Sequence, residues 1–165
     1  MTSSGPKAKR AAPAKPRIEF VIEDPHWREA GLRPALRRAA ARALAREGAD
    51  GGVTILLADD AALHRLNREF RGKDKPTNVL SFPAAENPER HLGDIAIAHG
   101  VSAGEARAAG KDFADHAAHL VVHGVLHLLG YDHETDAEAG VMEPLESEIL
   151  AGLGIADPYA ATVTA

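Results

Sequence analysis

The chain has 165 residues, 45% of them apolar and 26% charged, a length and composition that suit one folded domain with a substantial core but not two. It contains no cysteine, so disulfides and thiolate metal sites are excluded, and a reducing cytosol is permitted without being proven. No apolar run approaches the roughly 18 residues of a membrane span, and no secretion signal is recognisable, so we expect a cytoplasmic protein without a membrane partner.

The net charge of −5 is distributed unevenly along the chain. Residues 1–82 contain 16 Lys and Arg against 10 Asp and Glu, a balance of +6. Residues 83–165 contain 3 against 14, a balance of −11. A cationic half on an acidic protein is compatible with phosphate recognition on one face, and equally with the solvated faces of arginine-rich helices.

Basic residues, prolines and alanines fill residues 1–16, which contain no acidic residue and show no hydrophobic periodicity. We predict a disordered basic tail. An organelle transit peptide is an alternative, which the prolines disfavour because they break the amphipathic helix that such a peptide forms.

Strand and helix signals alternate in the next part of the chain. A β-branched and aromatic run predicts the first strand, spaced leucines and alanines predict a helix, and a short apolar run predicts the second strand. Asp59 or Asp60 is a suitable N-cap for another helix, which Gly72 ends. The predicted elements are a strand at 17–22, a helix at 34–47, a strand at 53–58 and a helix through Leu63, Leu66, Asn67 and Phe70.

Two further strands and three helices are predicted after residue 72. They are strands at 79–82 and 94–98, a short helix at 102–109, a long helix at 112–129 and a last helix at 136–150. Pro144 conflicts with the last helix, because proline lacks a backbone N–H and clashes with the preceding turn. We expect it to kink this helix or to mark its true start near Met142.

This order of elements predicts an α+β fold, with a small mixed four-stranded sheet packed with about five helices. The longest helix is expected to pack across the sheet. We predict a single domain at residues 17–155, followed by a loose C-terminal tail at 156–165.

Three histidines at the end of the long helix, His123, His127 and His133, have metal-ligand spacing, with offsets of zero, four and ten. His123 and His127 share one helical face. Gly130 can adopt the left-handed conformation that ends a helix, which would turn His133 toward the same ion. Three neutral imidazoles leave a fourth position for water, as in a catalytic zinc site, so we predict one Zn²⁺ at the end of this helix.

His116 and His119 extend the same stripe of histidines toward the start of the helix. We interpret them as residues that line a groove or orient the ligands, and His119 is also a candidate substrate-binding residue. For any single histidine, an ordinary interior or surface imidazole is the alternative interpretation.

The offsets match the HxxxHxxGxxH frame of metzincin proteases, but Gly124 stands where those enzymes carry a glutamate. That glutamate is the general base that activates the zinc-bound water, and glycine cannot replace it. Either the metal alone lowers the pKa of its water sufficiently, or the proton acceptor is the substrate or Asp132. Asp132 is alternatively a turn residue or a partner that orients a histidine.

A cationic segment follows the second predicted helix. Arg71 in the last turn complements the helix dipole, and its guanidinium could bind a phosphate with two hydrogen bonds. We treat Arg71 as a candidate catalytic and substrate-binding residue, and Lys73 and Lys75 as candidate substrate-binding residues. With Arg65 and Arg68 they make five cations within eleven residues, and a solvated helix end is the alternative.

Four segments of the chain resemble the YbeY family of bacterial single-strand-specific endoribonucleases, also called ribosomal RNA maturation factors. They are FRGKDKPTNVLSFP at 70–83, LGDIAIA at 92–98, HLVVHGVLHLLGYDH at 119–133 and MEPLESEILAGLG at 142–154. The resemblance implies an α+β fold, one zinc ion on His123, His127 and His133, and a functionally important Arg71. It also implies cytoplasmic action on ribosomal RNA, notably maturation of the 3′ end of the small-subunit RNA, and a role in ribosome quality control. The implied partners are ribosomal RNA and the small ribosomal subunit, with ribosomal proteins or an assembly GTPase.

The resulting hypothesis is a zinc-dependent hydrolase of RNA phosphodiesters, whose metal-dependent hydrolase domain spans residues 17–155. The acidic second half is expected to lie mostly away from the groove. Two alternatives stay open. One is a metallopeptidase, which Gly124 disfavours, and the other is a zinc-stabilised ribosome assembly factor that binds RNA without cleaving it.

Overall fold

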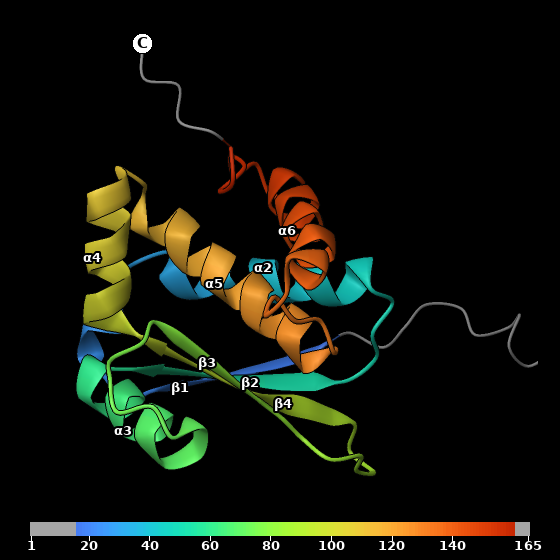
Figure 1. Cartoon of the computed structure of the whole chain (residues 1–165), viewed down its shortest axis with the longest axis horizontal. Helices are drawn as coiled ribbons and strands as arrows, with labels where there is room; N and C mark the ends of the chain where they lie inside the picture. The colour runs from blue at the N-terminus through green and yellow to red at the C-terminus, as the bar shows by residue number, and fades with distance from the viewer. Residues whose placement is uncertain (1–15, 161–165) are drawn as a thin grey trace, which may run out of the picture.

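The computed structural model describes residues 16–160, so nearly all of the predicted basic tail at 1–16 lies outside the described residues. These residues form a four-stranded sheet with five α-helices, which confirms the predicted α+β class (Figure 1). In chain order the elements are β1 (Arg17–Ile22), the 3-10 helix η1 (Pro25–Trp27), α2 (Leu32–Arg46), β2 (Gly52–Ala58), α3 (Asp60–Arg71), β3 (Val79–Pro83), β4 (His91–Ala98), α4 (His99–Ala109), α5 (Phe113–Leu128) and α6 (Asp136–Ala151).

The sheet is mixed and has the strand order β1-β2-β4-β3. Strands β1, β2 and β4 are parallel, whereas β3 pairs antiparallel with β4. Parallel neighbours need a crossover connection, and α2 supplies the one between β1 and β2. Strand β3 therefore lies at an edge of the sheet, next to β4.

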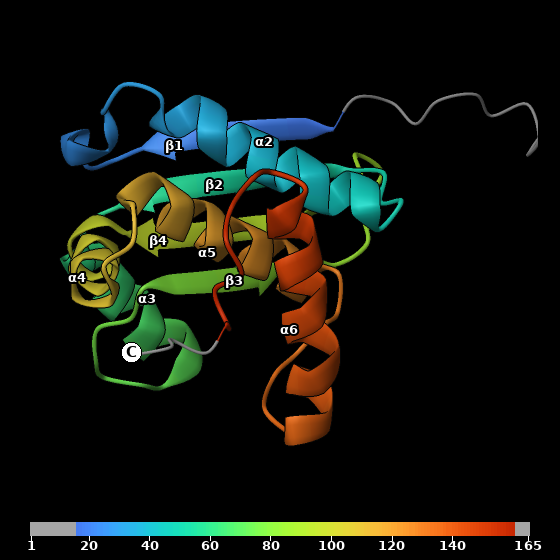
Figure 2. The same ribbon diagram turned by 90° about the horizontal axis from the view of Figure 1, so that it is seen from above.

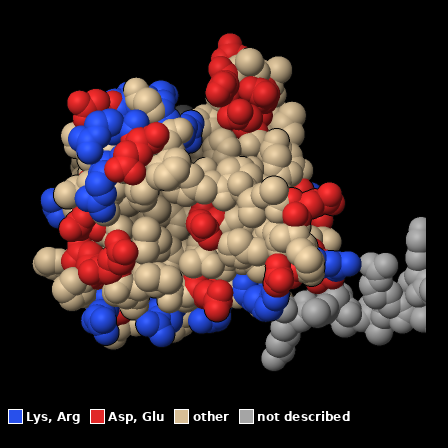
Figure 3. All heavy atoms as spheres, turned by 90° about the horizontal axis from the view of Figure 1, so that it is seen from below, with Lys and Arg blue, Asp and Glu red and all other residues tan. Residues whose placement is uncertain are grey.

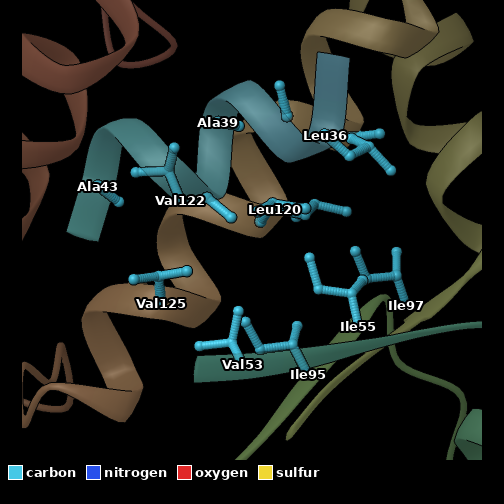
Figure 4. Packing of buried hydrophobic residues seen from close by; sticks show 14 of the residues in the cluster. Leu36, Ala39, Ala43, Val53, Ile55, Ile95, Ile97, Leu120, Val122 and Val125 are labelled. Carbon is cyan, nitrogen blue, oxygen red and sulfur yellow. The ribbon is translucent and has the colours of Figure 1, made fainter. Parts of the chain in front are cut away.

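The main core lies between the sheet and the two helices α2 and α5, which Figure 2 shows lying over one face of the sheet. Successive strand residues point to opposite faces, so alternate apolar residues of β2 and β4 meet these helices. Figure 4 shows this contact, in which Ile55 and Ile97 of the sheet lie below Leu36 of α2. The opposite face of the sheet is covered in part by α3, through Leu63.

Helix α5 is buried on most of its sides because it packs against the sheet, α2, α4 and α6. Gly124 allows its close approach to the sheet: a Cβ atom at this position would lie 2.9 Å from Cγ2 of Ile95 in β4. The Ser81 hydroxyl of β3 also donates a hydrogen bond to the Gly124 carbonyl, at 3.3 Å. The helix that carries the histidines is thus held directly on the two strands at this edge.

All the predicted elements form, and their ends lie within three residues of the predicted ends. The expectation that Pro144 marks a helix start near Met142 is wrong, because α6 begins at Asp136. Thr135 and Glu138 form a capping box there, which satisfies the first backbone N–H groups of the helix. The carbonyl that Pro144 leaves without its helical partner belongs to Gly140, an exposed residue that water can reach.

Within residues 16–160, none of the helices combines the length and the apolar character that crossing a membrane requires.

We expect the tight contact at Gly124 to be visible in the free energy of unfolding. Gly124→Ala gains helix propensity, but its methyl group must displace the buried Ile95, and overpacking costs roughly 1–3 kcal/mol. Gly140→Ala in α6 is the matched control, because nothing lies within 4 Å of the added methyl group. Urea denaturation should show Gly140→Ala stabilised by roughly 0.5–1 kcal/mol and Gly124→Ala destabilised. Equal stabilisation of both variants would contradict the close packing of α5 on β4.

Candidate metal centre

The three predicted metal ligands meet at the C-terminal end of α5. His123 and His127 lie one turn apart on the helix, which ends at Leu128. Gly130 has a φ of 104°, which favours glycine, and the reversed chain that follows it carries His133 back to the helix. One ring nitrogen from each histidine lies within 4.8 Å of the other two, so small side-chain rotations suffice to bring all three onto one ion.

The ring of His123 is oriented by a carboxylate from α6. Its Nδ1 lies 2.6 Å from Oε2 of Glu146, a distance at which Nδ1–H donates a short charge-assisted hydrogen bond. In a neutral imidazole this leaves the lone pair on Nε2, which is the form that binds a metal. The donor set therefore fits a divalent transition metal, because histidine ligands of such ions usually donate their other N–H to an oxygen acceptor.

Glu146 is the one fully buried carboxylate among the described residues. Burial alone would raise its pKa, but hydrogen bonds from His119, His123 and Tyr159 outweigh this effect and lower the pKa to about 2. His119 donates from Nε2 to Oε1 at 2.9 Å, and the Tyr159 hydroxyl donates to the same oxygen. The carboxylate is thus ionised and hydrogen-bonded at both oxygens, next to the predicted metal ligands.

The pKa of His127 is lowered to about 4, chiefly by burial. The neighbouring imidazoles of His123 and His133 contribute to this lowering, because a charge on one ring disfavours a charge on the next. At neutral pH this side chain is a neutral imidazole with a lone pair available for a metal.

The three histidines open into a cavity of 590 Å³ that the end of α3 and the following loop also line. Arg71, Lys73 and Lys75 all lie on its wall, whereas Arg65 and Arg68 of the same helix do not. In Figure 3, Lys and Arg side chains gather over α3 and the loop beyond it, and acidic side chains gather on the projecting first turns of α6.

Two acidic residues of the second half also line this cavity, Asp132 and Glu134. The separation of charge between the two halves of the chain is therefore incomplete at the site. The carboxylate of Asp132 accepts a hydrogen bond from the backbone N–H of His133 at 2.7 Å.

His119, the remaining candidate substrate-binding residue, does not line the metal cavity. Its imidazole points to Glu146 and lies beside Tyr159 of the C-terminal segment, with ring centroids 5.5 Å apart. Neither partner is among the residues predicted from the sequence. For Glu146 a signal exists, because it lies four residues after Met142 and four before Leu150, both of which are buried. For Tyr159 the sequence carries no such pattern.

The sheet, the central helix and the convergent histidines define an α+β protein with a cluster of histidines suited to a metal ion, in a partly cationic cavity. The chain belongs to the YbeY family, because the family model described as "Endoribonuclease YbeY" matches residues 21–154.

Relatives of high identity carry the same description. An "Endoribonuclease YbeY" of Azorhizobium caulinodans is 52% identical over 152 residues, which cover 87% of this chain and 96% of the relative. One of Rhodopseudomonas palustris is 48% identical over 171 residues, covering 94% and 86%. Among solved structures, the solution structure of TM1509 from Thermotoga maritima is similar with a TM-score of 0.55 and 26% identity, over 87% of this chain and 99% of that chain.

We expect Glu146 to make the stability of the metal-free protein depend on acid pH. Its pKa of about 2 lies below the ordinary value of 4.5, so its charge stabilises the fold above about pH 4.5 and this contribution is lost as the pH falls toward 2. Glu146→Gln should be less stable than the wild type by roughly 2–3 kcal/mol at neutral pH, and the difference should shrink between pH 4.5 and 2. Urea denaturation of both proteins across this range measures it; a difference that stays constant would show that the carboxylate is not held in its charged form.

Proposed function

We propose that this protein is a zinc-dependent, single-strand-specific endoribonuclease that acts in maturation of the small-subunit ribosomal RNA 3′ end and in ribosome quality control. The observation that carries the proposal is one cavity lined by three convergent histidines and by Arg71, Lys73 and Lys75, in a chain of the YbeY family. We place this activity in the cytoplasm and assign it to a hydrolase domain at residues 17–155. Its partners would be ribosomal RNA and the small ribosomal subunit, with ribosomal proteins or an assembly GTPase.

In this proposal His123, His127 and His133 hold the zinc ion, and Glu146 keeps the His123 ring in its ligating orientation. A bound zinc ion supplies Lewis-acid chemistry, which lowers the pKa of water and polarises a phosphoryl oxygen. Arg71 binds the phosphate with its planar guanidinium and stabilises negative charge that develops there. Lys73 and Lys75, on the same wall of the cavity, hold flanking phosphates of the strand.

The position of Gly124 supports a phosphodiester as the substrate and not a peptide bond. A side chain at this position would point into Ile95 of β4, so the helix offers no place for the glutamate that serves metzincins as general base. The cations on the cavity wall suit a polyanionic strand.

Arg71→Ala tests the role of the arginine. We expect the variant to retain the metal and the fold but to cleave RNA about 10²- to 10³-fold more slowly, as on loss of one group that stabilises transition-state charge. Arg68→Ala is the matched control, because Arg68 lies on the same helix outside the cavity. Cleavage of a single-stranded RNA under single-turnover conditions compares the two variants. Loss of metal from Arg71→Ala would instead assign the arginine a structural role.

Metal removal tests the role of the ion. His123→Ala, or chelation of the wild type, should abolish zinc binding, measured by elemental analysis, and RNA cleavage, while circular dichroism shows the fold intact. A different outcome would identify a zinc-stabilised assembly factor: chelation melts the protein, and the zinc-loaded, folded protein binds ribosomes without cleaving RNA. Digestion of casein but not of RNA by the zinc-loaded wild type would identify a metallopeptidase.

A further inference from the structure

The chain beyond α6 turns back over α5, as Figures 1 and 2 show. This brings Tyr159 to the buried carboxylate of Glu146, to which its hydroxyl donates a hydrogen bond. The same hydroxyl lies 3.3 Å from Nε2 of His119. Residue 159 lies outside the part of the chain that the family model matches, residues 21–154.

Several contacts hold this C-terminal segment, residues 155–160, in place. Ile155 packs against the main core, and its N–H donates to the Leu150 carbonyl at 2.9 Å. The carboxylate of Asp157 accepts hydrogen bonds from the Ser147 hydroxyl at 2.6 Å and from the Tyr159 N–H at 2.9 Å. The Tyr159 ring therefore has a defined position, although 41% of the residue is exposed.

The Tyr159 hydroxyl acts on the oxygen of Glu146 that does not face the metal ligand. Oε1 accepts from Tyr159 and His119, whereas Oε2 accepts from Nδ1 of His123 at 2.6 Å. A carboxylate is planar, so donors that hold Oε1 also hold the direction in which Oε2 points. Burial and the facing carboxylate raise the pKa of Tyr159 above its ordinary value, which keeps the hydroxyl protonated as a donor.

We propose that Tyr159 is a positioning residue of the metal centre, which acts through Glu146 on the ligand His123. The C-terminal segment is then part of the site, and it supports the ion without contacting it. This inference rests on the metal site of the proposed function and not on RNA cleavage.

The test is the zinc affinity of the full-length protein, measured by competition with a chromophoric chelator. Tyr159→Phe keeps the ring beside His119 and removes only the hydroxyl. Loss of groups that orient a ligand typically weakens metal binding by 10- to 100-fold, and for this more distant group we expect a loss of about tenfold. The metal-free variant should unfold at a somewhat lower temperature than the wild type, because the buried carboxylate of Glu146 loses one of its three donors, so the zinc affinity is measured where both proteins are folded.

A double-mutant cycle with Glu146→Gln shows whether the effect passes through the carboxylate. If it does, adding Tyr159→Phe to Glu146→Gln changes the zinc affinity less than about twofold. Nitrogen chemical shifts of the His123 ring in the metal-free protein give a second measurement, because they report which nitrogen carries the proton. Tyr159→Phe should lower the population protonated at Nδ1.

The inference is overturned if Tyr159→Phe binds zinc as tightly as the wild type, or if the loss is equally large in the Glu146→Gln background. Wild-type protein that binds no zinc would overturn the proposed function as well. Wild-type protein that binds zinc but cleaves no RNA would overturn the proposed function alone and leave the role of Tyr159 standing.

Discussion

The hydrogen-bonded carboxylate of Glu146 is the interaction on which the site depends. A fully buried charge is very costly unless it is paired, and here three donors satisfy it. Two of these donors, His119 and His123, come from α5, and the third, Tyr159, comes from the C-terminal segment. One side chain therefore joins α6, α5 and the end of the described chain beside His123, a predicted metal ligand.

Helix α5 serves the core and the site at once. Its apolar faces fill the space between the sheet and α2, and Gly124 brings it against Ile95 of β4. The stripe of histidines lies on the remaining side, where His123 and His127 face the cavity and His119 faces Glu146. Because protein interiors are close-packed, a change in the packing of this helix would also move the metal ligands.

The fold brings residues from the two oppositely charged halves of the chain to one cavity. The cations of the first half and the histidines of the second half line one cavity, with Arg71 on α3 and His127 on α5. Asp132 and Glu134 add negative charge on the histidine side. Such an arrangement favours a polyanion along the cationic wall and disfavours one along the acidic side, which in the proposed function would restrict how RNA lies in the cavity.

The sequence by itself determined the α+β class, the secondary structure and the convergence of His123, His127 and His133, because helical periodicity and a helix-ending Gly130 are local properties. Only the tertiary structure decided which distant groups meet them. The cationic segment after α3, the carboxylate from α6 and Tyr159 reach the site through contacts between residues far apart in sequence, which no local spacing encodes. The same limit explains Pro144, whose effect on α6 depended on a capping box that begins at Thr135 and on exposure of the carbonyl that it leaves unpaired.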